Sequence, residues 1–124
     1  MSAINTLLSV TSVDLETLRP EPTVEGFSEP GGYSCIAIRP IALRMVYEVA
    51  RAVTIPVIGL GGIVTPEDVV EFMLAGASAV QVGTASYADP RAVERISRGL
   101  ESWCRSHQVE RVASLIGALD MPRG

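Results

Sequence analysis

Two short apolar runs, each followed by small residues, constrain the fold of this 124-residue chain more than any other feature of its sequence. The first run covers residues 55–60 and has the composition of a strand that is buried on both faces. The second covers residues 79–82, and the stretch between the two runs is long enough for one helix. Strands joined by a single helix run parallel with a right-handed crossover, so the chain is predicted to have α/β architecture.

The intervening stretch carries helix signals at both ends. Thr65 is a favourable N-cap, Pro66 suits the first turn, and the two acids that follow lie near the positive end of the helix dipole. Gly76 falls where a residue in the left-handed conformation would end the helix. The apolar stripe expected to face the core consists of Val70, Met73 and Leu74.

Two longer helices are predicted on either side of this unit. One opens at Pro40 and runs to about Val53, and the other opens at Asp89 and Pro90 and ends near Ser106. The side chains expected to face the core are Met45, Val46, Val49 and Val53 in the first helix, and Val93, Ile96, Leu100 and Trp103 in the second. The charged side chains expected to face solvent are Arg44, Glu48, Arg91, Glu94, Arg98, Glu101 and Arg105.

The remaining segments give weaker signals. A short helix is predicted over residues 111–119, and residues 3–5 have the composition of the end of a strand. Residues 9–32 are rich in proline and glycine and show little periodicity, which predicts a long irregular loop of the kind that is usually functional. Residues 1–124 as a whole are predicted to form a single domain.

Charge and composition narrow the class of partner. The net charge of −4, with acids and bases interleaved, argues against a nucleic-acid surface, and no apolar stretch is long enough to span a membrane. The first residues lack the pattern of a targeting peptide, so a cytoplasmic setting is expected. Cys35 and Cys104 have no metal-type spacing, so no metal site is expected. All ten basic residues are arginine, which excludes Schiff-base and lysine-base chemistry within this chain.

Small residues follow both predicted strands. Gly61 and Gly62 come after the first strand, and Gly83 and Thr84 come after the second. Ligands bind at the carboxyl ends of parallel strands, and in (β/α)8 barrels the last two such loops often form a phosphate site. Backbone N–H groups without a neighbouring Cβ can approach a phosphate closely, which predicts a phosphate site at these four residues. The alternative is that the glycines only turn the chain out of its strands.

Five motifs occur along the chain in a recognisable order. They are residues 4–7 (INTL), 31–34 (GGYS), 37–40 (AIRP), 55–63 (IPVIGLGGI) and 75–84 (AGASAVQVGT). Together they resemble class 1 dihydroorotate dehydrogenases, most closely the catalytic subunits of class 1B. The resemblance covers nearly the whole chain, and it implies the C-terminal half of that subunit. The implied fold is a partial (β/α)8 barrel with the last strands and helices only.

The resemblance implies that FMN is the cofactor. Ile4 would border the flavin, and Gly61, Gly62, Gly83 and Thr84 would hold the FMN phosphate. The same four residues were predicted from the strand ends alone, so the two arguments agree on them.

The resemblance also implies a substrate site and the source of the chemistry. Asn5 and Thr6 would hydrogen-bond dihydroorotate or orotate, while Cys35 falls where the family has a glycine close to the flavin. In the family, hydride passes from substrate C6 to flavin N5 while a cysteine base removes the C5 proton. That cysteine and a flavin-contacting lysine lie in the N-terminal half of the barrel, so no catalytic residue is expected in this chain.

The implied function is oxidation of dihydroorotate to orotate in pyrimidine biosynthesis, by an enzyme of which this chain forms a part that is inactive alone. The expected partners are a complementing barrel half or a second copy of the chain and, in class 1B, a subunit with FAD and an iron–sulfur cluster that reduces NAD. Two alternatives stay open. One is the flavin domain of dihydropyrimidine dehydrogenase, which has a similar AIRP segment, and the other is a non-catalytic phosphate-binding or assembly module. The loop at Gly83 and Thr84 favours dihydroorotate dehydrogenase over the first alternative.

Overall fold

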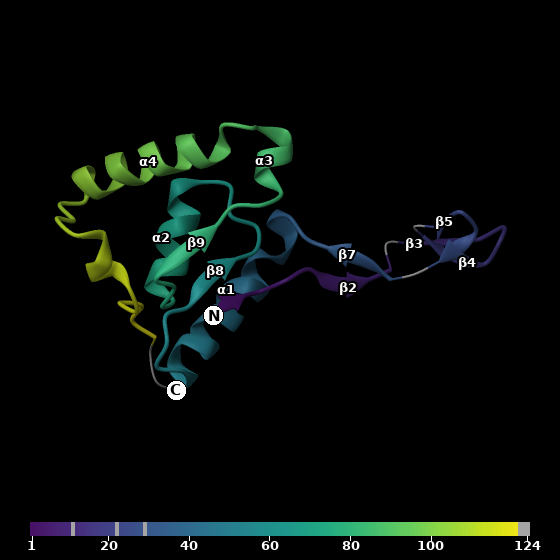
Figure 1. Cartoon of the computed structure of the whole chain (residues 1–124), viewed down its shortest axis with the longest axis horizontal. Coiled ribbons are helices and arrows are strands. Elements are labelled where there is room, and N and C mark those ends of the chain that lie inside the picture. The colour runs from purple at the N-terminus through teal and green to yellow at the C-terminus, as the bar shows by residue number, and fades with distance from the viewer. Residues whose placement is uncertain (11, 22, 29, 122–124) are drawn as a thin grey trace.

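A three-stranded parallel sheet forms the centre of the molecule (Figure 1). The computed structural model describes residues 1–10, 12–21, 23–28 and 30–121. The strand order is β1 (Ser2–Ala3), β8 (Ile58–Leu60), β9 (Ala79–Gln81), and both neighbouring pairs are parallel. The helices are η1 (Ile36–Ile38), α1 (Arg39–Ala52), α2 (Pro66–Leu74), α3 (Ala85–Ala88), α4 (Ala92–Ser106) and η2 (Val112–Leu115). The predicted α/β unit of strand, helix and parallel strand is confirmed, with strands shorter than their apolar runs.

Helix α2 connects β8 to β9 and begins where its capping signals predicted. The Thr65 hydroxyl accepts a hydrogen bond from the Asp68 amide at 3.2 Å, and the Asp68 carboxylate accepts one from the Thr65 amide at 2.8 Å. These two bonds form a capping box. Gly76, with a φ of 116°, follows the end of the helix as expected.

The two faces of the sheet have different surroundings. On one face Ala3 and Gly59 are buried, and a Cβ on Gly59 would come within 2.6 Å of the Phe72 ring. This close approach allows α2 to pack directly on β8. On the other face Leu60 is half-buried and Gln81 is exposed, so that face is left accessible at the carboxyl end of the sheet.

Helices α1 and α4 confirm the two longer helices predicted, but each contains one error in the predicted core face. Val46 and Ile96 are buried as expected. Met45 is 41% exposed and Val93 is 56% exposed, because each lies about 100° around its helix from a buried neighbour. Ala92 is the residue buried at the start of α4 in place of Val93.

The charged faces of both helices point to solvent, as predicted. Arg44 Nε lies 2.9 Å from Glu48 on α1, and Arg98 lies 2.6 Å from Glu94 on α4. Each pair is separated by one helical turn, the spacing at which opposite charges stabilise a helix surface.

Residues 9–32 do not form the irregular loop that was predicted for them. They contain antiparallel strand pairs, most of which extend away from the sheet as an arm, residues 12–28 (Figure 1). The pairs are β2 (Leu7–Ser9) with β7 (Gly31–Tyr33), β3 (Ser12–Asp14) with β4 (Arg19–Glu21), and β5 (Thr23–Val24) with β6 (Phe27–Ser28).

Local turn chemistry explains why this segment pairs with itself. Glu25 and Gly26 have φ values of 51° and 82°, and they join β5 to β6 as a two-residue turn of the type I′ kind. The Asp14 carboxylate accepts hydrogen bonds from the amides of Glu16 at 2.8 Å and Thr17 at 3.2 Å. These bonds shape the turn between β3 and β4 and hold the pKa of Asp14 below its ordinary value.

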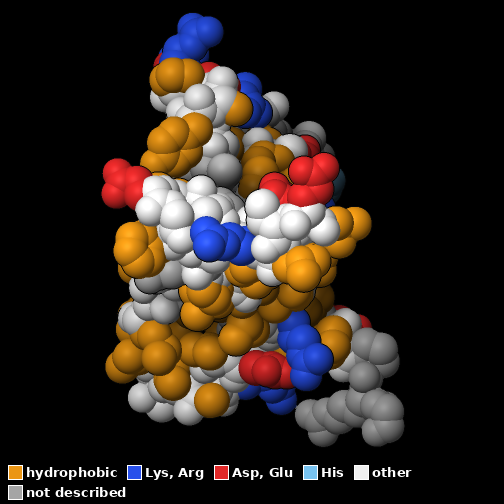
Figure 2. Space-filling model, turned by 90° about the vertical axis from the view of Figure 1, so that its right-hand side faces the viewer, with side chains coloured by type: hydrophobic (Ala, Val, Ile, Leu, Met, Phe, Trp, Pro, Cys, Tyr) orange, Lys and Arg blue, Asp and Glu red, His pale blue; other side chains and the backbone are white. Residues whose placement is uncertain are grey.

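The arm carries large apolar side chains that are open to solvent. Leu15, Leu18 and Phe27 are each more than three quarters exposed. Seen from the side of the arm, hydrophobic groups are interspersed with acidic groups and arginine over this face (Figure 2). Several large apolar side chains exposed on one short segment are typical of surfaces that bind other molecules.

The C-terminal segment also differs from its prediction, because the short helix η2 replaces the helix expected over residues 111–119. The Gly117 amide donates to the Met73 carbonyl at 2.9 Å, and the Leu119 amide donates to the Leu74 carbonyl at 3.1 Å. These amides therefore satisfy the last carbonyls of α2 instead of extending a helix of their own. Among the helices of the described ranges, none is both long enough and apolar enough to cross a membrane.

Candidate functional site

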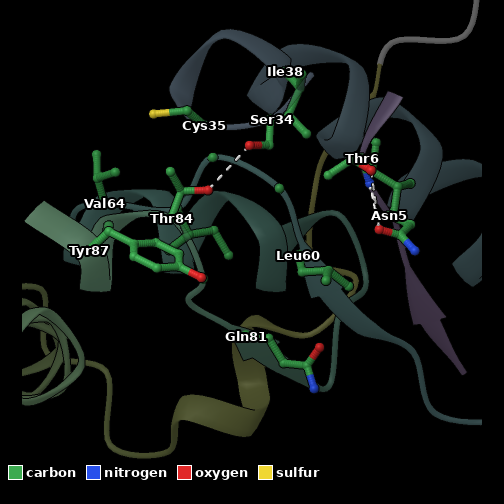
Figure 3. Close-up of a pocket in the computed structure, with 16 residues that line it drawn as sticks. Asn5, Thr6, Ser34, Cys35, Ile38, Leu60, Val64, Gln81, Thr84 and Tyr87 are labelled. Atoms are coloured by element: carbon green, nitrogen blue, oxygen red, sulfur yellow. Dashed lines mark hydrogen bonds between the residues drawn. The ribbon is translucent and has the colours of Figure 1, made fainter. Parts of the chain in front are cut away.

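A cavity of about 320 Å³ lies at the carboxyl end of the parallel sheet (Figure 3). Segments that follow β1, β8 and β9 line it, together with the loop that leads into η1. The residues predicted to bind cofactor or substrate all line this one cavity: Ile4, Asn5, Thr6, Cys35, Gly61, Gly62, Gly83 and Thr84. The structure thus brings together residues that are up to 80 positions apart (from residue 4 to residue 84) in the chain.

The parallel pairing of β1 with β8 explains the position of the first segment. The Ile4 amide donates to the Leu60 carbonyl at 3.0 Å, so the chain leaves β1 directly beside the loop that follows β8. The Thr6 amide donates to the Asn5 side-chain oxygen at 2.7 Å. The two polar side chains lie together at one end of the cavity (Figure 3).

The loop after β8 requires its two glycines. Gly61 has a φ of 131°, and a Cβ there would lie 2.6 Å from the Ala42 Cβ. Gly62 has a φ of 76°, and a Cβ there would lie 2.8 Å from the Cys35 carbonyl oxygen. Their positive φ values and the close packing around them therefore require glycine at both positions whether or not a ligand binds.

Gly83 is different, because the surrounding protein gives no steric reason for a glycine. A Cβ built at Gly83 meets no atom within 4 Å, and its φ is not in the left-handed region. Gly83 nevertheless lines the cavity, so the open space beside its Cα is available to a ligand.

Backbone donors are available on both sides of this space. Among the hydrogen bonds of the described residues, none has the amide of Gly62, Thr84 or Ala85 as its donor. The Thr84 hydroxyl lies 3.5 Å from the Ser34 hydroxyl, so polar groups from two walls meet at this point. None of the described residues that line the cavity is acidic, so these amides and hydroxyls form a donor set that suits an oxyanion such as a phosphate.

Cys35 occupies a backbone conformation that belongs to glycine. Its φ is 70° and its ψ is −167°, a combination that side chains with a Cβ rarely adopt. The thiol side chain is exposed at the cavity wall. The local conformation therefore agrees with the resemblance, which places a glycine at this position.

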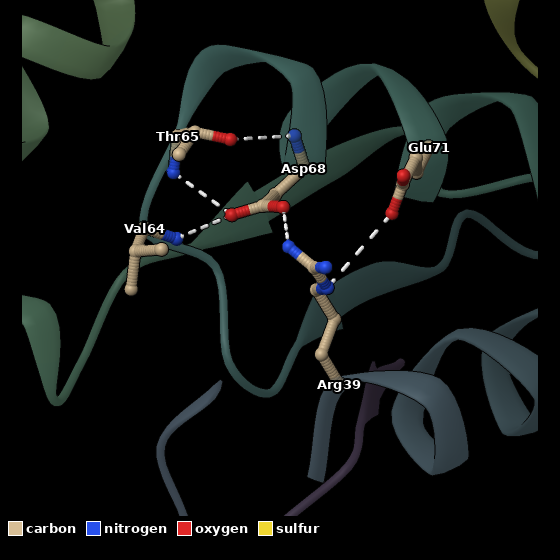
Figure 4. Close-up of polar contacts among 5 residues, drawn as sticks. All are labelled: Arg39, Val64, Thr65, Asp68 and Glu71. Carbon is tan, nitrogen blue, oxygen red and sulfur yellow. Dashed lines mark hydrogen bonds and ion pairs between the residues drawn. The ribbon is translucent and has the colours of Figure 1, made fainter. Parts of the chain in front are cut away.

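An ion pair between half-buried Arg39 and buried Asp68, outside the cavity lining, was not identified from the sequence (Figure 4). Asp68 is 2% exposed, and its carboxylate accepts hydrogen bonds from the Val64 and Thr65 amides, each at 2.8 Å. Arg39 donates to the other carboxylate oxygen, and its Nε lies 3.9 Å from Glu71. The spacing of Thr65 and Asp68 was a signal for the capping box, but nothing in the sequence pointed to Arg39 as the partner.

Three other polar or aromatic wall residues, Ser34, Gln81 and Tyr87, were also not predicted. Tyr87 is 93% exposed and lies on α3, a four-residue helix that the sequence did not indicate. Within the part of the chain that the structure describes, no three His, Cys, Asp or Glu side chains gather as metal ligands would.

The family model and the relatives that match this chain agree on one protein family. Residues 1–103 match the family model described as dihydroorotate dehydrogenase. Over 121 residues the chain is 52% identical to a protein of Citrifermentans bemidjiense and 48% identical to one of Bacteroides thetaiotaomicron. Both are named "Dihydroorotate dehydrogenase B (NAD(+)), catalytic subunit". The alignments cover 98% of this chain but only 38% of each relative, so the chain spans less than two fifths of their length.

Proposed function

Because this chain belongs to the dihydroorotate dehydrogenase family, we propose that it forms the flavin-phosphate end of an active site that oxidises dihydroorotate to orotate. The observation that carries the proposal is the meeting of the loops after β8 and β9 at one cavity. This arrangement corresponds to the phosphate sites built by the last two strand–helix loops of (β/α)8 barrels.

The proposed cofactor is FMN. The Gly62 amide on one side and the Thr84 and Ala85 amides on the other would donate to its phosphate, and Gly83 would let the ligand approach the backbone. Ile4 would border the isoalloxazine ring. Bound flavin would supply a two-electron acceptor for the substrate hydride, which no side chain of this chain could replace.

The proposed substrate site lies at the Asn5 end of the cavity. Asn5 and Thr6 supply an amide and a hydroxyl that could hydrogen-bond the carboxylate and ring of dihydroorotate. Because both residues follow β1 directly, the sheet would hold the substrate in a fixed orientation beside the flavin.

The catalytic base and the flavin-contacting lysine are proposed to come from outside this segment. The chain has no lysine, and Cys104 lies half-buried on α4 rather than at the cavity. Cys35 is the only cysteine of the cavity wall among the described residues, and it occupies the flavin-facing glycine position of the resemblance. We therefore expect the 124-residue chain to bind flavin without oxidising dihydroorotate.

The proposed main partner of this chain is the remaining part of a (β/α)8 barrel, because the parallel sheet has two edges. β1 and β9 are the two edges of the parallel sheet, and edges of this kind pair readily with further strands. The exposed apolar side chains of the arm support a second contact, with another copy of the chain. A subunit carrying FAD and an iron–sulfur cluster is the proposed electron acceptor, since the named relatives are catalytic subunits of NAD(+) enzymes.

A non-catalytic phosphate-binding module is the second candidate, and the absence of lysine favours it. The names of the relatives support dihydroorotate dehydrogenase over dihydropyrimidine dehydrogenase.

Both candidates assume that the cavity binds a phosphate group. Titration of the purified chain with FMN and with riboflavin, followed by flavin fluorescence, tests this assumption. We expect FMN to bind at least about tenfold more tightly, since only FMN carries the phosphate. Equal affinities, or binding of neither flavin, would contradict both candidates.

A second experiment separates the two candidates. The chain is mixed with FMN and with the N-terminal remainder of the Citrifermentans bemidjiense relative, and dihydroorotate is added without oxygen. Bleaching of the flavin absorbance supports the enzyme, whereas FMN that stays bound and oxidised supports the module.

A further inference from the structure

We propose that Asp68 and Arg39 are positioning residues that fix the loop after β8 for the flavin phosphate. The inference rests on the proposed function, because it concerns the same cavity. Neither residue lines the cavity, so both would act through the backbone of residues 61–65.

Asp68 determines the direction of two amides in this loop. Its carboxylate accepts the N–H groups of Val64 and Thr65 at 2.8 Å each, from a position that is only 2% exposed. These amides are therefore turned toward the interior, while the Gly62 amide two residues earlier is left for the cavity. A carboxylate that holds two backbone amides restrains the loop far more than a single neutral hydrogen bond.

Arg39 connects two walls of the cavity, the loop that leads into η1 and the loop that follows β8. It lies at the start of α1, immediately after the loop that carries Cys35 and η1. That loop packs tightly on the loop after β8, since a Cβ on Gly62 would lie 2.8 Å from both the Arg39 Cβ and the Cys35 carbonyl oxygen. The bond from Arg39 to Asp68 therefore holds the two loops together (Figure 4).

The ion pair also reduces the electrostatic repulsion between Asp68 and a bound phosphate. An unpaired carboxylate bonded to the loop that binds a phosphate would repel the dianion, and burial would strengthen the repulsion. Arg39 neutralises Asp68, whereas Glu71 is 48% exposed and lies 3.9 Å from Arg39 Nε. Removal of either member should therefore weaken phosphate binding, by lost geometry for Asp68 and by unbalanced charge for Arg39.

The test compares FMN with riboflavin on the full 124-residue chain, using four variants. Asp68→Asn and Arg39→Gln should each weaken FMN binding about tenfold and change riboflavin binding by less than about twofold. Arg39→Lys should recover most of the FMN affinity, because it restores the positive charge. Glu71→Gln is the matched control, since it removes one acidic charge beside the same arginine without touching the loop, and it should leave both affinities unchanged.

Amide hydrogen exchange gives a readout independent of flavin. In Asp68→Asn, the Val64 and Thr65 amides should both exchange faster, because they donate to the same carboxylate oxygen and a neutral amide group is a weaker acceptor. Their unchanged protection would overturn the positioning role.

The outcomes separate this inference from the proposed function. A wild-type chain that does not prefer FMN over riboflavin contradicts the proposed function itself. A wild-type chain that prefers FMN, with the preference retained in Asp68→Asn and Arg39→Gln, overturns only the positioning role. Circular dichroism reports whether each variant folds. If Asp68→Asn does not fold, equal FMN affinities in Arg39→Gln and Arg39→Lys would overturn the inference.

Discussion

Replacement of Cys35 by glycine should make the chain more stable, although it deletes a side chain. The residue has a φ of 70° and a ψ of −167°, which is a region that glycine occupies readily and that other residues occupy only under strain. Its side chain is exposed, so little packing is lost with the thiol. The strain arises from the Cβ, and only glycine removes it.

The change in the free energy of unfolding for Cys35→Gly is the difference between two opposing effects. Strain at such a position is about 1–3 kcal/mol. Glycine loses more backbone entropy on folding than other residues, which offsets about 0.5–1 kcal/mol of that gain. The free energy of unfolding should therefore rise by about 1 kcal/mol, equivalent to a few degrees in Tm for a chain of this length.

Urea denaturation under reducing conditions measures this change, with Cys35→Ala as the matched control. Alanine removes the thiol but keeps the Cβ, so its free energy of unfolding should stay close to that of the wild type. If the alanine and glycine variants are equally stable, or if glycine destabilises the chain, the strain at residue 35 is absent and the reasoning is refuted. The glycine variant should also bind FMN more tightly, because it restores the close approach that the resemblance implies.

Three further substitutions test other parts of the structure. Gly83→Ala places a methyl group in open space, so the free energy of unfolding should change by less than about 0.5 kcal/mol while FMN affinity, read by fluorescence, falls about tenfold. Phe72→Ala empties a fully buried site and should lower the free energy of unfolding by about 3–5 kcal/mol in urea; a loss below 1 kcal/mol would contradict the core described here. The Arg91 amide and then the Arg95 side chain lower the pKa of Asp89, so its stabilising contribution is complete above the ordinary value of 3.8 and is lost as pH falls through the lower folded-state pKa. Asp89→Asn should accordingly flatten the acid side of a plot of urea midpoint against pH, and an unchanged slope would count against this role.

The sequence predicted the sheet and its connecting helix well because local and tertiary preferences agree there. Thr65 and Pro66 cap a helix at the position where the sheet needs one, and Gly76 adopts the positive φ that ends it. The strand-end glycines were informative for a similar reason, since parallel strands deliver their carboxyl ends to one edge.

The arm and the helix faces were harder to predict because their signals are weaker. The turn at Glu25 and Gly26 lacks the Asn-Gly or Asp-Gly sequence that marks a type I′ turn most clearly. Met45 and Val93 are apolar residues next to buried ones, and only packing decides which of the two neighbours faces the core.

The Arg39 and Asp68 pair could not be predicted from spacing at all. The two residues are 29 positions apart and lie on different helices, so only the tertiary fold brings them together. Their contact with the cavity is indirect, through the amides of Val64 and Thr65, and sequence motifs do not record contacts of this kind.

The most direct test of the central claim is an NMR titration of the isotope-labelled chain with FMN and, separately, with riboflavin. If amides after two parallel strands hold one phosphate, the Gly62, Thr84 and Ala85 amide signals should shift together with FMN and should move far less with riboflavin. Shifts at only one of the two loops, or the same shifts with both flavins, would contradict the claim.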